Sequence, residues 1–399
     1  MGFTTPFKSF SDVKSDNPLV QAAVEDQTIG FHSVRNANDL APILEGDVLV
    51  DELLVRLGVR HVISVGLPVL IADRTIDLEQ GRGFGLGDLG LQGLLVGAGS
   101  SSLIYNKDLL AKYIATDGAK IKDVKDIDNF DTLKAVADDI QAKKDQLGVK
   151  GAFTSAGFDS SSDWRFKTHL ANLPLYYEFK DDNITKQPAT VKGTYLPEYK
   201  NIFDLYLKDS TTEPTQLSSK TGDDATSEFS LGEAVFYQNG TWAWTDLQKN
   251  GMKAESIGML PIYTGVKGEE NQGLATGSEN YWCINSKASD ADKQATKDFL
   301  KWVVTSKTGI ESLSSAMGFT TPFKSFSDVK SDNPLVQAAV EDQNSDKTAV
   351  SWNFTMMPSE EWKNQLGSAL LEYAQGTGDW DAVKTAFVDG WKTEYDASH

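Results

Sequence analysis

Hydrophobic and polar positions along the chain fall into blocks that alternate between a helical period and a strand period. Residues 46–58 (GDVLVDELLVRLG) carry apolar side chains at helical spacing and end on Gly58, a residue that favours helix termination. Residues 28–34 are typical of a short strand, and the β-branched run 59–66 (VRHVISVG) is typical of a buried one. This succession of strand, helix and strand predicts a parallel α/β unit.

From Leu103 onward the pattern is regular and predicts more elements of the same kind. The first expected elements are a strand end leading into a helix at 102–113, an amphipathic helix with Asp and Asn caps at 126–148 and a strand at 151–159. Residues 224–247 are expected to form a helix, then a turn at Asn239-Gly240 and then an aromatic strand, and residues 255–265 a further strand. Residues 278–306 are expected to form a strand, a capped turn and a helix, and residues 358–395 two helices joined by Gly-Thr-Gly. The chain is therefore expected to be α/β, with helices at its C-terminal end.

One long segment occurs twice. Residues 1–27 (MGFTTPFKSFSDVKSDNPLVQAAVEDQ) recur without a change at 317–343. Repeats that tile a solenoid diverge and follow one another, so a solenoid is excluded. The copy at 317–343 follows a predicted helix, whereas the first copy has no such context. We interpret residues 1–27 as an added duplicate, from engineering or chimera construction, with a recent natural duplication as the alternative. Identical segments compete for one docking place, which predicts a disordered first copy or a domain swap in an otherwise monomeric protein.

Residues 81–102 (GRGFGLGDLGLQGLLVGAGSSS) are unusually rich in glycine. They contain GxGxxG-like fragments, which in dinucleotide-binding proteins follow a strand, open a helix and precede an acidic residue. The periodicity here supports none of these features. We therefore expect a loop and no nucleotide cofactor.

The composition restricts the classes of partner. There are 38 Lys and Arg against 57 Asp and Glu, giving a net charge of −19, which repels nucleic acid and anionic membranes. No apolar run is long enough to cross a bilayer. Cys283 is the only cysteine and lies in an apolar stretch, and the four histidines are scattered. Neither a disulfide framework nor a metal site is expected.

Six segments, in order along the chain, resemble the extracellular solute-binding proteins of ABC sugar importers. They are YNKDLL (105–110), FSLGEAVFYQNGTWAW (229–244), IGMLPIYTG (257–265), the stretch 276–313 with its strand and helix, MGFTTPFKSF (317–326) and MPSEEWKNQLGSALLEYAQG (357–376). The Gly-Thr-Trp-Ala-Trp run is the most specific piece. The resemblance covers about three quarters of the chain.

The resemblance implies a two-lobed fold, each lobe a mainly parallel sheet flanked by helices, with the C-terminal helices closing the second lobe. The first lobe would comprise residues 28–106 plus about 272–328, and the second residues 107–271 plus about 329–399. It also implies a function: an oligosaccharide is bound when the lobes close, and is delivered to the membrane subunits of the importer. The expected location is extracellular or periplasmic, as a membrane-tethered lipoprotein in the natural parent, although no signal sequence is visible at the start of this chain.

The chain departs from the family in its first hundred residues. No tryptophan precedes Trp164, although the chain has nine, and the family usually places sugar contacts in that region. Residues 46–66 instead have a faint likeness to the opening helix and strand of thiamine-diphosphate enzymes. We therefore expect an altered or chimeric first lobe.

Aromatic and polar residues supply the candidate ligand site. A sugar presents an apolar C–H face that packs on indole and phenol rings, and hydroxyls that pair with amides and carboxylates. Trp242 corresponds to the family's stacking position, and Trp244, two residues on, is expected in the core. The candidate ligand-binding residues are Trp242, Trp362, Trp164, Asp163, Glu279, Asn280, Tyr281 and Asn239, with Trp282 and Trp352 as further aromatic candidates. Asn239 has an alternative role as a turn residue.

Two alternatives remain open on the sequence. A glycoside hydrolase also uses aromatics and acids, but it needs two convergent carboxylates, and no such pair stands out. An engineered or chimeric scaffold with weak or no sugar binding would explain the exact duplication and the glycine-rich stretch. The identity of the sugar is not encoded in any motif that we recognise.

Overall fold

The computed structural model describes residues 84–86, 91–155, 157–159, 162–285, 290–316 and 331–399. The chain divides into two compact units, with unit 1 formed by residues 1–98 and 278–330 and unit 2 by residues 99–277 and 331–399. The boundaries proposed from the sequence, at 106/107, 271/272 and 328/329, stay a prediction. Predictions for residues 1–83, which include the first copy of the repeat and the elements at 28–66, fall outside the described residues, as do residues 317–330 of the second copy.

Unit 1 contributes the antiparallel pair β1 and β2, the later part of β6 and a helical segment to the described structure. Strand β1 (Phe84–Leu86) pairs with the beginning of strand β2 (Leu91–Asn106). The later part of strand β6 (Gln272–Asn285) leads toward helix α11 (Asp290–Thr305), which is followed by α12 (Lys307–Glu311) and the π-helical turn η10 (Ser312–Ala316). The predicted loop at 81–102 is therefore wrong for residues 84–86, which form β1, and for residues 91–102, which belong to β2. Backbone pairing of a glycine-rich segment gives no hydrophobic periodicity for a sequence reading to detect.

Unit 2 is built on a mixed sheet. The strands are ordered β3-β4-β2-β6-β7, where β3 is Gly151–Phe153, β4 is Ala234–Gly240 and β7 is Thr348–Ser351, and β5 (Ile257–Leu260) pairs with β2. β3 with β4 and β6 with β7 are parallel, whereas β2 runs antiparallel to both β4 and β5. The α/β fold is confirmed, and the long antiparallel strand β2 makes the sheet mixed.

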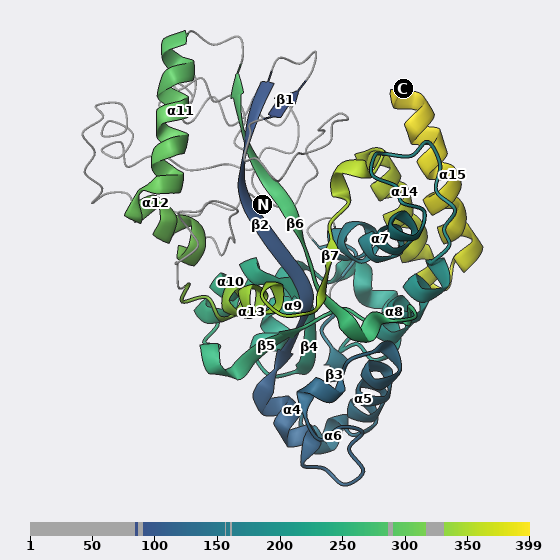
Figure 1. Ribbon diagram of the computed structural model, residues 1–399. Helices are drawn as coiled ribbons and strands as arrows, with labels where there is room; N and C mark the ends of the chain where they lie inside the picture. The colour runs from purple at the N-terminus through teal and green to yellow at the C-terminus, as the bar shows by residue number, and fades with distance from the viewer. Residues whose placement is uncertain (1–83, 87–90, 156, 160–161, 286–289, 317–330) are drawn as a thin grey trace. The chain divides into compact units, whose positions relative to one another are not determined.

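Helices surround this sheet in unit 2 (Figure 1). The α-helices are α4 (Lys107–Ile114), α5 (Phe130–Ala142), α6 (Lys144–Leu147), α7 (Asn172–Asp181), α8 (Leu196–Lys208), α9 (Gly222–Ser230), α10 (Trp244–Lys249), α13 (Pro334–Gln343), α14 (Glu360–Gln375) and α15 (Trp380–Ser398). The shorter turns are the π-helix η5 (Arg165–Leu170) and the 3-10 turns η4 (Val124–Asp126), η6 (Pro214–Ser219), η7 (Thr241–Ala243), η8 (Ala254–Ser256), η9 (Glu269–Asn271) and η12 (Phe354–Met356).

Capping residues in the sequence explain several helix ends. The predicted helix at 126–148 is confirmed as α5 and α6, with the Asn129 side chain accepting from the Thr132 backbone N–H and Gly148 ending α6 in the left-handed region. The two C-terminal helices, α14 and α15, pack against each other, and Gly376 ends α14 with a φ of 74°. The Gly-Thr-Gly connection was thus predicted correctly.

The segment 239–247 differs from its prediction. Asn239 and Gly240 end strand β4 and do not form a hairpin turn, and the expected aromatic strand is the 3-10 turn η7 followed by α10. Trp244 is buried in a hydrophobic core cluster with Phe229 and Tyr237. Its predicted place in the core is therefore confirmed, although it lies on a helix and not on a strand. The short alternation of aromatic and small residues fits a strand and a tight helical turn equally well.

Two neighbouring carboxyls come from Asp138 on α5 and from Asp209, directly after α8. Asp209 follows α8, its side chain is 0% exposed, and its backbone carbonyl accepts the Phe153 N–H at 3.0 Å. Burial, and then the neighbouring carboxyl of Asp138, raise the pKa of Asp209 to about 7. Burial also opposes ionisation of Asp138, but hydrogen bonds from Lys134 and Lys208 outweigh it and bring the pKa of Asp138 to about 2.

Asp209→Asn is expected to stabilise the protein above neutral pH. A carboxyl with a raised pKa keeps its proton in the folded state while the unfolded chain loses it, so its destabilising contribution grows between about pH 4 and pH 7 and is complete above pH 7. One pKa unit corresponds to about 1.4 kcal/mol, and relaxation around the group reduces the net gain to about 1–2 kcal/mol. Urea denaturation at pH 8 and pH 4 tests this: an equal effect of the substitution at both pH values would contradict it.

Candidate functional site

Three tryptophans of unit 2 form one aromatic cluster. Trp164, Trp242 and Trp352 are all half-buried, and Trp242 lies 5.9 Å from Trp164 and 6.3 Å from Trp352 between ring centroids. Phe354 stacks on Trp352 at 5.0 Å. The buried His169 lies between them, with its ring 4.7–5.7 Å from each of the four aromatic rings. We call Trp164, Trp242, Trp352 and Phe354 the aromatic surface.

Glycine allows Trp242 to lie close against the sheet. Trp242 follows strand β4 in the turn η7, and its six-membered ring packs over Gly240 and Gly99 of the adjacent strand β2. A Cβ atom at Gly240 would lie 2.2 Å from the indole, and one at Gly99 would lie 2.9 Å from it. These positions therefore require glycine for the indole to keep its place, irrespective of backbone conformation.

Gly240→Ala is expected to displace the Trp242 indole while leaving the strand in place. The added methyl group conflicts with three atoms of the ring, all within 2.6 Å of the new Cβ, so the side chain must rotate away. We expect the intrinsic fluorescence of Trp242 to move toward the red as its ring leaves the cluster. Gly251→Ala is the control for the ring contact, because no atom lies within 4 Å of a Cβ there. Its φ of 88° adds backbone strain that Gly240 does not have, so the control is expected to lower stability without shifting the spectrum. Identical spectra for the wild type and Gly240→Ala would contradict the packing described.

A separate set of backbone contacts holds Trp352. Its N–H donates to the carbonyl of Thr276 on β6 at 3.1 Å, and its indole Nε1 donates to Ser101 Oγ at 3.3 Å. The fully buried Asn172 donates from Nδ2 to the carbonyl of Ser351 and accepts the Asn353 N–H at 2.7 Å. The residues on either side of Trp352 are thus fixed by one side chain of α7, which sets the direction of the indole.

Polar groups accompany Trp164. The Asp163 carboxylate forms an ion pair with Lys167 Nζ at 2.6 Å, and the same Nζ donates to Asn364 Oδ1 at 2.9 Å. Asp163 is half-buried and Asn364 is exposed. This arrangement links α14 to the π-helix η5 and leaves carboxylate and amide oxygens next to the aromatic surface, the pair of groups that a sugar hydroxyl can use.

Two of the predicted ligand contacts are corrected by the structure. Trp362 is 0% exposed: its Nε1 donates to the carbonyl of Phe387 at 3.0 Å and its ring packs edge-on against Phe387 and Trp391. It is a core residue between α14 and α15. Asn239 is 5% exposed, and its amide is used internally, donating to the Tyr237 hydroxyl and accepting the Gly240 N–H. Neither side chain is available to a ligand.

Of the other predicted ligand-binding residues, the structure describes the side chains of three and leaves three undescribed. Trp242, Trp164 and Asp163 are brought together, and their role in binding stays a prediction. Glu279, Asn280 and Tyr281 lie on strand β6, but their side chains, like that of Trp282, fall outside the described ones.

Sequence reasoning gave too little weight to Trp352 and did not identify Phe354 or His169 as members of the cluster. The Trp-Asn-Phe spacing at 352–354, shortly before the predicted helices at 358–395, was a usable signal. His169 lies five residues after Trp164, on the one-turn π-helix that brings both rings to the same side. A π-helical turn has no recognisable sequence pattern, so this juxtaposition could not be found without coordinates.

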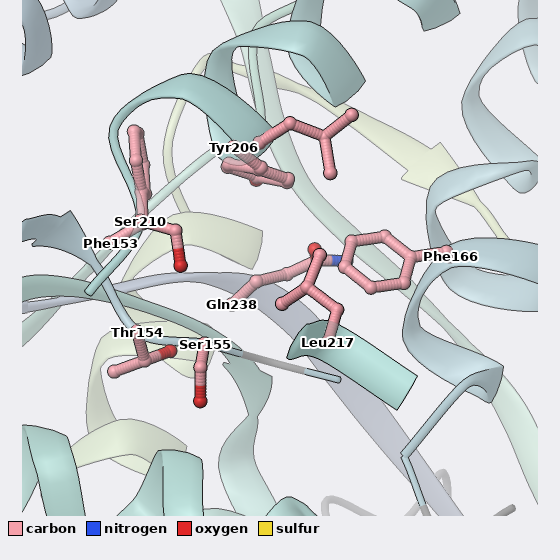
Figure 2. Close-up of a pocket in the computed structure, with 9 residues that line it drawn as sticks. Phe153, Thr154, Ser155, Phe166, Tyr206, Ser210, Leu217 and Gln238 are labelled. Carbon is pink, nitrogen blue, oxygen red and sulfur yellow. The ribbon is translucent and has the colours of Figure 1, made fainter. Parts of the chain in front are cut away.

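A small cavity in unit 2 is lined by residues from β3, β4, η5, α8 and η6 and from the loops next to them (Figure 2). Its lining combines hydroxyls and an amide with aromatic and aliphatic groups, from Phe153, Thr154, Ser155, Phe166, Tyr206, Leu207, Ser210, Leu217 and Gln238. Its volume of about 20 Å³ suits one water molecule and is far below the ~300–1,000 Å³ of pockets that enclose small ligands. A saccharide does not fit in it.

Buried carboxylates in unit 2 act as structural acceptors. Glu269 accepts the backbone N–H groups of Phe130, Thr264 and Gly265 at 2.7–2.9 Å, and although burial raises its pKa, these bonds oppose the rise. Glu228 accepts from the backbone and hydroxyl of Ser155. Among the described residues, no group of three or more His, Cys, Asp or Glu is placed to hold a metal ion. In the same part of the chain, no helix has the length and apolar character needed to span a membrane.

Comparison with known proteins gives both a family and a fold. Residues 72–341 match the family model described as bacterial extracellular solute-binding protein. The structure is similar to that of a chitin oligosaccharide binding protein, with 19% identity and a TM-score of 0.58 over 77% of this chain and 71% of that one. It is also similar to the solute-binding protein RafE in complex with raffinose, with 16% identity and a TM-score of 0.55 over 92% and 90%.

A third similar structure is maltose-bound MalE3 of T. maritima, with 19% identity and a TM-score of 0.52 over 75% of this chain and 72% of that one. Identities this low establish a shared fold and no more. No curated protein sequence matches the chain.

Proposed function

The chain belongs to the bacterial extracellular solute-binding proteins, and we propose that it binds an oligosaccharide on the aromatic surface of unit 2. The observation that carries the proposal is the cluster of three half-buried indoles, in which Trp242 lies 5.9 Å from Trp164 and 6.3 Å from Trp352 between ring centroids. Large apolar rings left partly exposed on a soluble protein mark interaction sites. Indole rings match the C–H faces of sugar rings in shape and polarity.

Fixed geometry makes this surface suitable for binding. Gly240 and Gly99 admit the Trp242 ring against the sheet, and Asn172 fixes the chain on both sides of Trp352. Because the rings are already held in place, little side-chain entropy is lost when a ligand packs on them. Asp163 supplies a carboxylate that, with Asn364, is suited to sugar hydroxyls at the edge of the surface.

The solved structures with this fold support the choice of ligand class. Their names record a chitin oligosaccharide, raffinose and maltose, all carbohydrates, as the bound or recognised molecule. In this proposal the ligand is captured as two lobes close, with the first lobe adding contacts, and the closed protein is presented to the membrane subunits of an ABC importer. We further propose that the natural parent is a membrane-tethered lipoprotein that acts as a monomer.

The family is one of binding proteins, and we propose that this chain has no enzymatic activity. A glycoside hydrolase needs two carboxyls about 5–10 Å apart across the scissile bond, one of them with a raised pKa. The buried acids Glu228 and Glu269 are occupied by backbone donors, and Asp163 is held by Lys167. Asp209, whose pKa is raised beside Asp138, is 0% exposed and cannot reach a substrate. These contacts favour binding over hydrolysis. The alternative of a chimeric scaffold without a ligand makes a different prediction, that no sugar binds.

Calorimetric titration with raffinose, maltotriose, xylotriose and chitotriose tests the proposal, with product analysis of each mixture after prolonged incubation. We expect saturable heat with at least one of the four sugars, and no cleavage of any of them. Release of shorter sugars would favour the hydrolase, and the absence of heat with all four would favour the scaffold.

A further inference from the structure

Arg165 is a buried cation next to the aromatic surface. It is 4% exposed, at the start of the π-helix η5 and directly after Trp164. The lysines nearby, such as Lys167, pair with carboxylates at 2.6 Å. The acceptors that the structure shows for Arg165 are neutral oxygens: the carbonyls of Gln238 and Ser162 and the hydroxyl of Tyr237. Burying a charge against neutral groups costs free energy, so other contacts must stabilise this cation.

The guanidinium of Arg165 lies over the faces of two aromatic rings, which stabilise its charge as a carboxylate would. The guanidinium carbon lies 4.4 Å from the centroid of the Trp164 ring and 5.8 Å from that of Tyr237. The hydrogen bonds to the neutral oxygens are long, at 3.3–3.5 Å, so the contact with Trp164 is a major part of what stabilises this cation. A planar guanidinium stacked on an indole restricts both rotation and tilt of the ring.

The same residue joins Trp164 to the strand that carries Trp242. Nε of Arg165 donates to the backbone carbonyl of Gln238, and the side-chain amide of Gln238 donates back to the carbonyl of Arg165 at 3.1 Å. Gln238 lies on β4, two residues before Gly240 and four before Trp242. This reciprocal pair fixes the start of η5 against β4, and thereby the 5.9 Å separation of the two indoles.

We propose that Arg165 is the positioning residue of the aromatic surface: it backs the Trp164 indole and ties it to strand β4, so that Trp164 and Trp242 are presented together to the sugar. The expected effect of Arg165 on sugar binding rests on the proposed function. Its effect on the position of the Trp164 ring rests only on contacts within the free protein. Arg165 itself makes no contact with the ligand.

The first experiment measures Trp164 in the free protein. In protein labelled with 5-fluorotryptophan, the signal of Trp164 is assigned from Trp164→Phe, and Arg165→Met is expected to shift and broaden that signal. Arg165→Lys keeps the charge without the planar fork and is expected to give a smaller shift. Lys200→Met is the matched control, since Lys200 lies over the rings of Tyr373 and Trp380, and it is expected to leave the Trp164 signal unchanged.

The second experiment measures sugar affinity through a double-mutant cycle with Trp164→Ala. Using whichever of raffinose, maltotriose, xylotriose or chitotriose the wild type binds most tightly, Arg165→Met is expected to weaken binding about tenfold. In the Trp164→Ala background the same change is expected to have little further effect, because Arg165 acts through that ring. Lys200→Met is expected to keep the wild-type affinity.

Each result decides the proposal. An unchanged Trp164 signal in Arg165→Met overturns it, as does an equal loss of affinity with and without the Trp164 side chain, since a general structural role gives that pattern. If none of the four sugars binds the wild type, the proposed function fails, and the Trp164 signal alone decides whether Arg165 positions the ring.

Discussion

Trp242→Ala is expected to weaken oligosaccharide binding by about 30-fold or more while leaving the fold intact. Its half-buried ring lies at the centre of the aromatic surface, in contact with Trp164 and Trp352. Removing an aromatic anchor from the middle of a binding surface costs about 2 kcal/mol or more, which corresponds to that factor. Calorimetric titration with the sugar that the wild type binds best measures the loss.

The control for this substitution is Trp380→Ala. Trp380 is also half-buried, but its ring packs on Tyr199 and Tyr373 in the helical part of unit 2, with no contact to the aromatic surface. We expect it to lower stability and to keep the wild-type affinity at a temperature where the variant is folded. Equal losses of affinity in the two variants would show that the effect comes from general destabilisation and not from a ligand contact.

Trp362→Ala is expected to lower the free energy of unfolding by about 3–5 kcal/mol, the usual range for removing a fully buried large aromatic side chain. Its ring is enclosed by Phe387 and Trp391. Removal of its Nε1 would also leave the buried carbonyl of Phe387 without a hydrogen-bond donor. Guanidinium denaturation followed by circular dichroism measures the change. Sugar affinity of the folded fraction is expected to stay at the wild-type value.

Trp362→Phe provides the comparison for this prediction. It keeps an aromatic ring in the core and removes mainly the Nε1 donor, so a loss well below that of the alanine variant is expected. A Trp362→Ala variant as stable as the wild type, or one that loses sugar binding without losing stability, would restore Trp362 to the ligand site and contradict its assignment to the core.

Several element types from Leu103 onward were predictable from the sequence. Asn129 and Gly148 mark the two ends of the α5–α6 segment with capping chemistry, and Gly376 marks the end of α14. These are local signals, readable without knowledge of the tertiary structure. Strand β2 was only partly predictable, since in Leu91–Ser102 the strand is defined by pairing with other strands, β1 at its start and β4 at Ser101 and Ser102, and not by its own periodicity.

The candidate site was predictable in composition but not in geometry. The structure places the rings of Trp164 and Trp242, 78 positions apart in the chain, 5.9 Å from each other. Trp164 was selected from its polar loop after a predicted strand, and Trp242 was selected from the family resemblance; their role in binding stays a prediction. Trp362 was also selected from the family resemblance and is buried, since a tryptophan at a helix start has the same sequence context whether it faces the core or a ligand. Arg165 was not selected, because its contact with Trp164 depends on a π-helical turn.

The central claim is that a saccharide ring packs on Trp164, Trp242 and Trp352. Fluorine NMR of 5-fluorotryptophan-labelled protein, with signals assigned by single Trp→Phe substitutions, tests it most directly during titration with the four oligosaccharides. We expect the signals of these three residues to move with a common saturation curve, while those of the buried Trp362 and Trp391 stay fixed. Saturable binding that leaves all three signals unmoved would contradict the account.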